Sequence, residues 1–194
     1  MIPARDEPRA PADDGSRRRE RLFFALWPDA ACRAALAALA RERLPRKRGR
    51  AVADENLHLT LAFLGAVDGG FRACAEDAAA SVSVAPFVLS FERSGYWPRS
   101  RVLWSAPAET PPALHRLASA LSRALLPCGY EPERRAFSGH VTLARKVQGP
   151  IETLPHAPIA WAVREFHLVR SETRSEGASY EVVATWALGE VPAA

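Results

Sequence analysis

The feature of this sequence that most constrains its fold is a short pattern that occurs twice. His58-Leu59-Thr60-Leu61 is followed 82 residues later by His140-Val141-Thr142-Leu143. In both copies polar and apolar residues alternate, as in a β-strand with one face toward the core. Each copy therefore predicts a strand that carries a His and a Thr on the same polar face.

The rest of the chain alternates between strand and helix patterns. Short apolar runs bounded by Pro, Gly or Asp predict strands, and Leu and Ala at three- and four-residue spacing predict helices. This order of elements belongs to the α+β class with a largely antiparallel sheet. Helices are expected at 30–43, 71–82 and 111–125, and strands at 21–27, 57–64, 87–91, 101–105, 137–145, 161–170 and 180–188.

The length of 194 residues gives room for one domain. Apolar residues make up 48% and charged residues 25%, which excludes a wholly disordered chain. Residues 1–20 are rich in Pro, Ala and charge and predict a disordered tail, so we expect the domain to occupy residues 21–190. No apolar stretch reaches the roughly 18–20 residues of a membrane helix, and we expect no membrane association.

The three cysteines, Cys32, Cys74 and Cys128, are odd in number, widely spaced and without a CxxC pair. We expect all three to be reduced residues of helices. Residues 1–20 show no apolar signal segment, so a cytoplasmic location is expected.

Two histidines and two threonines on strand faces can perform acid–base chemistry on a phosphodiester. Metal-free cleavage needs one group to take a proton, a second to give one, and donors for the phosphoryl oxygens. Because free imidazole titrates at about 6.5, one ring can be neutral while the other is protonated. The alternative is that the His and Thr residues only reflect strand propensity. No phosphate loop, nucleophile elbow, HExxH motif or acidic metal cluster competes, so no metal and no cofactor are expected.

Several segments together resemble a known family. They are Arg21–Leu26, Glu55–Gly65, Arg101–Trp104 and His140–Arg145. They are similar to the 2H phosphoesterase superfamily, and within it to the bacterial and archaeal RNA 2′,3′-cyclic phosphodiesterases, historically called 2′-5′ RNA ligases. The resemblance implies a bilobal α+β fold. In it, two pseudo-symmetric, largely antiparallel sheets form a central cleft with helices outside.

The resemblance also implies an activity and roles for residues. Family members open an RNA 2′,3′-cyclic phosphate to a 2′-phosphate, and some join RNA through a 2′-5′ linkage without ATP. Carried over, His58 is the proton donor and His140 the proton acceptor, while Thr60 and Thr142 hold the phosphate. The residues alone leave open which histidine is the acid. Arg145 matches an arginine common after the second motif and is a candidate substrate-binding residue, although strict alternation turns it away from His140 unless a bulge intervenes.

One position departs from the family pattern. The family usually has Pro before the second motif histidine, whereas this chain has Ser138-Gly139. Gly frees the backbone that Pro would fix, so we expect this strand to enter the cleft less rigidly.

Three alternatives for the partner remain open: an RNA end, a small cyclic-phosphate nucleotide, and RNA bound by a catalytically weak module of the same fold. The basic segment Arg41–Arg50 favours RNA, although it could also be a solvated loop. A monomer is expected. Three other histidines are expected at the surface: His115, His156 and His167. The tryptophans are expected to pack in the core: Trp27, Trp97, Trp104, Trp161 and Trp186. Tyr96 and Trp97 are candidates to stack on a base.

Overall fold

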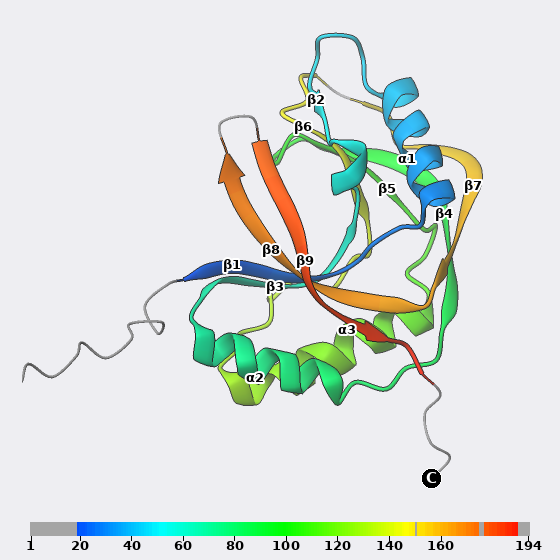
Figure 1. Cartoon of the computed structure of the whole chain (residues 1–194). Coiled ribbons are helices and arrows are strands. Elements are labelled where there is room, and N and C mark those ends of the chain that lie inside the picture. Colours follow the sequence, from blue (N-terminus) through cyan, green and yellow to red (C-terminus); the bar gives the residue numbers. More distant parts are fainter. Residues whose placement is uncertain (1–18, 150, 175–176, 190–194) are drawn as a thin grey trace, which may run out of the picture.

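The chain is organised by an open antiparallel sheet, seen in a computed structural model that describes residues 19–149, 151–174 and 177–189 (Figure 1). The helices are α1 (Ala30–Arg43), α2 (Gly69–Ala80) and α3 (Pro112–Leu125), with short 3-10 turns η1 (Asp54–Asn56) and η2 (Leu126–Cys128). The strands are β1 (Glu20–Leu26), β2 (Arg50–Ala51), β3 (Leu59–Val67), β4 (Phe87–Trp97), β5 (Val102–Ala106), β6 (Val141–Arg145), β7 (Leu154–Val163), β8 (Glu165–Arg174) and β9 (Gly177–Ala187).

The sheet consists of two four-stranded halves that meet at a narrow seam. Its order is β7-β4-β5-β6-β3-β1-β8-β9, and β2 pairs with β6 beside this path. A single residue pair, Leu59 with Val141, joins the halves. In each half, one strand of the repeated motif lies at the seam. This motif strand comes after a strand and a helix in both halves: β1, α1 and β3 in one, and β5, α3 and β6 in the other. The expected α+β fold with two related halves is therefore confirmed.

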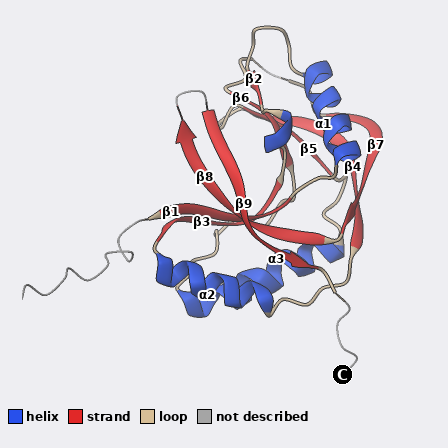
Figure 2. Cartoon of the chain, in the orientation of Figure 1, coloured by secondary structure: helices blue, strands red, loops and turns tan. Residues whose placement is uncertain are grey.

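The helices cover the sheet in two places, as Figure 2 shows, with α2 and α3 together at one end and α1 apart from them. α1 contacts β6 and β7, whereas α3 contacts α2, β3 and β4. Asp29 and Asp68 cap α1 and α2 by accepting hydrogen bonds from backbone amides at 2.8 and 2.9 Å. The predicted apolar stripe of α3 is fully buried: Leu114, Leu117, Leu121 and Leu125.

The sequence did not predict β2, and β4 continues past its expected end at residue 91 to Trp97. The largest differences from the prediction are at β7 and β8. The single strand expected at 161–170 is wrong, because β7 ends at Val163 and β8 begins at Glu165. β7 extends back to Leu154 through Pro155 and Pro158. The two prolines argued against a strand in this segment. Proline is tolerated here because β7 is an edge strand that pairs only with β4, so a missing backbone N–H can be on the unpaired side.

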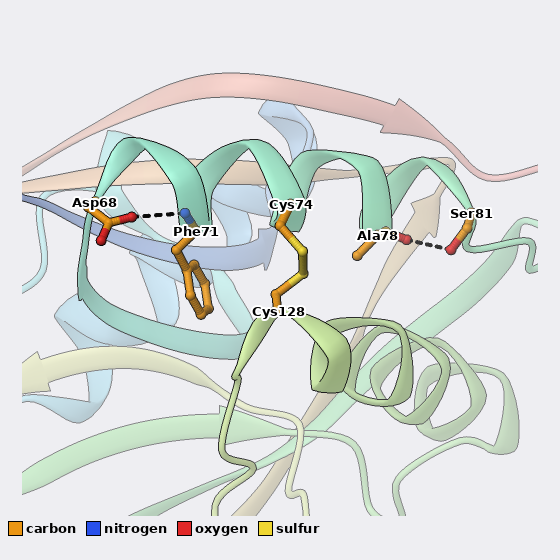
Figure 3. Close-up of a disulfide and its surroundings, with 6 residues drawn as sticks. All are labelled: Asp68, Phe71, Cys74, Ala78, Ser81 and Cys128. Atoms are coloured by element: carbon orange, nitrogen blue, oxygen red, sulfur yellow. Dashed lines mark hydrogen bonds between the residues drawn. A yellow bond between two sulfur atoms is a disulfide. The ribbon is translucent and has the colours of Figure 1, made fainter. Parts of the chain in front are cut away.

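The prediction that all three cysteines are reduced is also wrong. Cys74 of α2 and Cys128 of η2 form a disulfide, with Cα atoms 5.7 Å apart (Figure 3). The packing of α2 on α3 brings together residues that are 54 positions apart, which spacing alone could not show. Cys32 is free and buried. The expected cytoplasmic location stays a prediction.

Two further expectations concern the extent of the domain. The predicted tail at 1–20 lies largely outside the described residues, since the description begins at residue 19. The boundaries of 21–190 therefore stay a prediction. Of the helices in the described ranges, none has the length and apolar character needed to cross a membrane.

Candidate active site

The seam of the sheet brings both motif histidines to one face. Leu59 and Val141 are directly paired and fully buried, so their side chains point into the core. In an antiparallel pair, neighbouring residues along each strand point to the opposite face. Continuing this register sets His58 beside Thr142 and Thr60 beside His140 on the face away from the core. One cross-strand pair thus gathers the four residues of two distant motifs.

Both histidines are held in the same tautomer. The Nδ1 atom of His58 lies 2.7 Å from the carbonyl oxygen of Asn56, and the Nδ1 atom of His140 lies 2.9 Å from that of Ser138. Because a carbonyl oxygen can only accept, each Nδ1 carries the proton and donates it. The Nε2 atom of each neutral ring is therefore left as the atom that can exchange a proton with a ligand.

Aromatic side chains surround His58. Trp27 stacks on its ring at 5.4 Å between centroids, Phe23 lies at 4.9 Å, and Tyr180 approaches edge-on at 5.1 Å. His140 has a similar neighbour, because Trp97 meets it edge-on at 4.5 Å. Both rings are thus partly removed from water by apolar surfaces that come from outside the motifs.

This environment lowers the pKa of both histidines. Burial lowers the pKa of His58 to about 4, and the positive charges of Arg145 and His140 add to the effect. Burial also lowers the pKa of His140, helped by Arg145. The carbonyl hydrogen bonds of Asn56 and Ser138 act in the opposite direction. At neutral pH both rings are therefore neutral in the free protein.

These shifts predict an unusual pH profile for turnover of a phosphodiester. A general acid–base pair needs one protonated and one neutral ring, and this state is most populated between the two pKa values. Since both pKa values lie below 6.5 in the free protein, we expect kcat/KM to peak below pH 6.5. An anionic bound substrate favours the protonated rings, so kcat should peak at higher pH than kcat/KM. Rates measured from pH 4 to 9 test this, and a kcat optimum at or below that of kcat/KM would contradict it.

A cavity of about 870 Å³ opens beside Thr60 and His140. Its walls include Trp97 and the exposed Phe63, which β3 turns outward through bulges in its pairing with β1. Of the two residues expected to stack on a base, Trp97 lines this cavity. Tyr96 does not, because it packs against the core and donates its hydroxyl to the Val147 carbonyl at 3.2 Å.

Gly139 has a packing reason that the sequence did not reveal. A Cβ atom at this position would lie 2.5 Å from a methyl carbon of Leu114, which is fully buried in α3. A side chain at position 139 would therefore require Leu114 to shift, because the segment before β6 passes close to this residue of α3. The expected effect of Gly139 on the rigidity of the strand stays a prediction.

A bulge turns Arg145 toward the site. The pairing of β5 with β6 shifts from Trp104 opposite Thr142 to Leu103 opposite Ala144, so Leu143 is an extra residue in β6. An extra residue reverses the alternation beyond it. Arg145 is exposed, and its charge lowers the pKa of both motif histidines. The bulge that a role of Arg145 at the cleft requires is therefore present.

The other histidines lie apart from this set. His115 is exposed on α3, as predicted, and His156 is half-buried and bonded to Ser105 at 3.1 Å. The surface position predicted for His167 is wrong. Only 6% of His167 is exposed, because β8 lies between β1 and β9 and His167 is paired with a residue of each. Thr185 is bonded to its Nδ1 at 2.9 Å.

Sequence reasoning missed the aromatic residues that shape the site. Trp27 was assigned to the core, and Phe23 and Tyr180 were not singled out as site residues. No local signal marks them, because they reach His58 across β1 and β9. The described residues contain no group of three or more His, Cys, Asp or Glu that could hold a metal ion.

The fold and the site together define a class of protein: two antiparallel half-sheets, each of which brings one His-x-Thr strand to a shared cleft. The family model described as the 2′-5′ RNA ligase superfamily matches residues 27–174. The chain belongs to this superfamily.

Individual relatives agree with this assignment. An RNA 2′,3′-cyclic phosphodiesterase of Escherichia coli (strain K12) is 34% identical over 171 residues, which cover 87% of this chain and 97% of the relative. One from Thermus thermophilus is 32% identical over 187 residues, covering 87% and 90%. The crystal structure of E. coli LigT in apo form has a TM-score of 0.82 to this fold at 32% identity, covering 89% of this chain and 99% of that chain.

Proposed function

We propose that the chain is an RNA 2′,3′-cyclic phosphodiesterase that leaves a 2′-phosphate. The observation that carries the proposal is the matched pair of histidines, each with Nδ1 bonded to a carbonyl and Nε2 free, on one face with two threonines. The similarity to relatives that bear this name, over 87% of this chain and at least 90% of each relative, supports the same activity. A LigT structure complexed with 3′-AMP shows that a relative's fold holds a nucleotide.

The proposed reaction is hydrolysis of one phosphorus–oxygen bond. His140 takes a proton from water through Nε2 as the water oxygen attacks phosphorus. The bond from phosphorus to the 3′ oxygen breaks, and His58 gives its Nε2 proton to that oxygen. The product carries a 2′-phosphate and a 3′-hydroxyl, with one water added. These two roles follow the family resemblance.

The remaining residues would stabilise charge on the phosphate. Thr60 and Thr142 lie within the same register and can donate hydroxyl protons to the non-bridging oxygens. Arg145 can place a positive charge near the same group. Because the phosphate is anionic, its binding raises the pKa of His58 and allows this ring to be protonated when it acts as the acid. The same attack with an RNA 5′-hydroxyl in place of water, again with departure of the 3′ oxygen, gives a 2′-5′ linkage and a 3′-hydroxyl without ATP.

A defined RNA end tests the proposal. The purified protein is incubated with EDTA, without nucleoside triphosphate, and with an oligoribonucleotide that ends in a 2′,3′-cyclic phosphate. We expect the RNA to gain the mass of one water and the new end to be a 2′-phosphate that phosphatase removes. The same RNA ending in a 3′-phosphate is the control and should not change. A 3′-phosphate product, or reversible loss of turnover on chelation, would contradict the proposal.

Two alternatives give different results in this assay. Hydrolysis of nucleoside cyclic phosphates in preference to RNA would indicate a small-nucleotide enzyme, and the cavity of about 870 Å³ beside His140 has room for such a ligand. Binding of the RNA without any product would indicate a binding module.

A further inference from the structure

Two arginines face each other on a strand pair next to the cleft. The pairing of β2 with β6 sets Arg50 directly opposite Arg145. Directly opposite residues share a face of the sheet, with Cβ atoms about 4.5–5.5 Å apart, and like charges there are destabilising. Since the bulge in β6 turns Arg145 toward the cleft, Arg50 lies on the cleft side as well. An anion bound between them would relieve the repulsion.

Among the described residues, no carboxylate neutralises either charge. In the stretches that the structure covers, no carboxylate forms an ion pair with Arg50 or Arg145. Other arginines behave differently: Arg41 lies 3.6 Å from Asp54, and Arg170 lies 2.8 Å from Glu20. The two arginines therefore remain available to an external anion.

Two connected loops extend the same basic surface. The Gln148 amide donates to the Arg48 carbonyl at 2.7 Å, and the Arg48 guanidinium lies against Gly149. Segments 46–50 and 145–149 contain no acidic residue. We define the basic rim as their exposed cations: Arg46, Lys47, Arg48, Arg50, Arg145 and Lys146.

The position of the rim indicates the size of its ligand. Arg145 follows His140 by five residues, which is about 16 Å along a strand at ~3.3 Å per residue. Arg50 lies on the neighbouring strand at the same level. A ligand with one phosphate, held by the threonines at the seam, has no second phosphate for Arg50 to bind. A polynucleotide carries further phosphates and can occupy both places.

We propose that Arg50, opposite Arg145, binds a backbone phosphate of the RNA next to its reacting end, and thereby selects oligoribonucleotides over nucleoside cyclic phosphates. This inference rests on the proposed function and names its substrate class. Arg50 acts by binding and takes no part in the bond change.

The test compares Arg50→Gln with the matched variant Arg116→Gln. Arg116 is exposed on α3, which lies at the far end of the molecule from β2 in Figure 1. kcat/KM is measured for a six-nucleotide RNA with a 2′,3′-cyclic phosphate end and for a nucleoside 2′,3′-cyclic phosphate. Arg50→Gln should lower the ratio of RNA to nucleoside kcat/KM by about tenfold, mainly through KM, and reduce the salt slope of RNA binding by about 0.7. Arg116→Gln should leave both unchanged.

Several outcomes would overturn the inference. They are an unchanged ratio in Arg50→Gln, an equal fall for both substrates, or the same loss in Arg116→Gln. Relief of repulsion should also keep the thermal midpoint of Arg50→Gln at or above the native value, which separates lost binding from lost folding. If the native protein hydrolyses neither substrate, the proposed function fails. Binding of the same RNA ending in a 3′-phosphate then tests the rim by itself, and weaker binding by Arg50→Gln than by Arg116→Gln supports it.

Discussion

Replacement of either motif histidine, His58→Ala or His140→Ala, is expected to lower kcat on a cyclic phosphate RNA by about 10²–10⁴-fold. Loss of a general acid or base has an effect of this size. The two rings act in one step, since a proton leaves one oxygen and reaches another. The double variant should therefore lose little more than either single variant, because residues that act as a unit are not additive. Single-turnover rates with saturating protein measure the effect.

The matched control is His115→Ala. His115 is exposed on α3, and its ring bonds to the hydroxyl of Ser119 at 3.3 Å. This variant should keep kcat within about twofold of the native value, and all variants should keep the native thermal midpoint within a few degrees. A motif variant with native turnover would remove that histidine from the proposed mechanism. Multiplicative losses in the double variant would show that the rings do not act together.

Breaking the disulfide is expected to give the largest loss of stability. The bond between Cys74 and Cys128 closes a loop of 54 residues. A loop of this length restricts the unfolded chain, and its release costs about 2–4 kcal/mol. For a chain of this size, that corresponds to a fall in thermal midpoint of roughly 5–15 °C. Thermal unfolding of the native protein with and without reductant measures the change.

The double variant Cys74→Ala/Cys128→Ala controls for other effects of the reductant. Its thermal midpoint should match that of the reduced native protein and should not respond to reductant. Thiol titration of the unfolded native protein without reductant should find one free thiol, from Cys32. Three free thiols and a midpoint that reductant does not change would contradict the disulfide.

Local sequence patterns predicted most of the elements. α1 was predicted with its observed bounds because Asp29 caps it and Leu36 and Leu39 supply a buried stripe. The two motif strands were predicted because alternation requires only neighbouring residues. The strand β7 was missed because Pro155 and Pro158 suppress the local signal, and only its place at the sheet edge permits them.

The sequence by itself determined which residue types carry the chemistry. Two His-x-Thr copies on alternating segments establish a polar face on each strand, since side-chain direction follows from position along one strand. The sequence also carried the likeness to the superfamily to which the chain belongs.

Only the tertiary structure decided how these residues meet. The pair Leu59–Val141 sets the register that puts both motifs on one face, and the bulge at Leu143 decides the direction of Arg145. Burial of His167 and the bond between Cys74 and Cys128 were likewise beyond prediction. The physical reason is common to all of them. Pairing across strands and helices depends on residues far apart in the chain, whereas alternation, helical spacing and capping depend on residues within a few positions of one another.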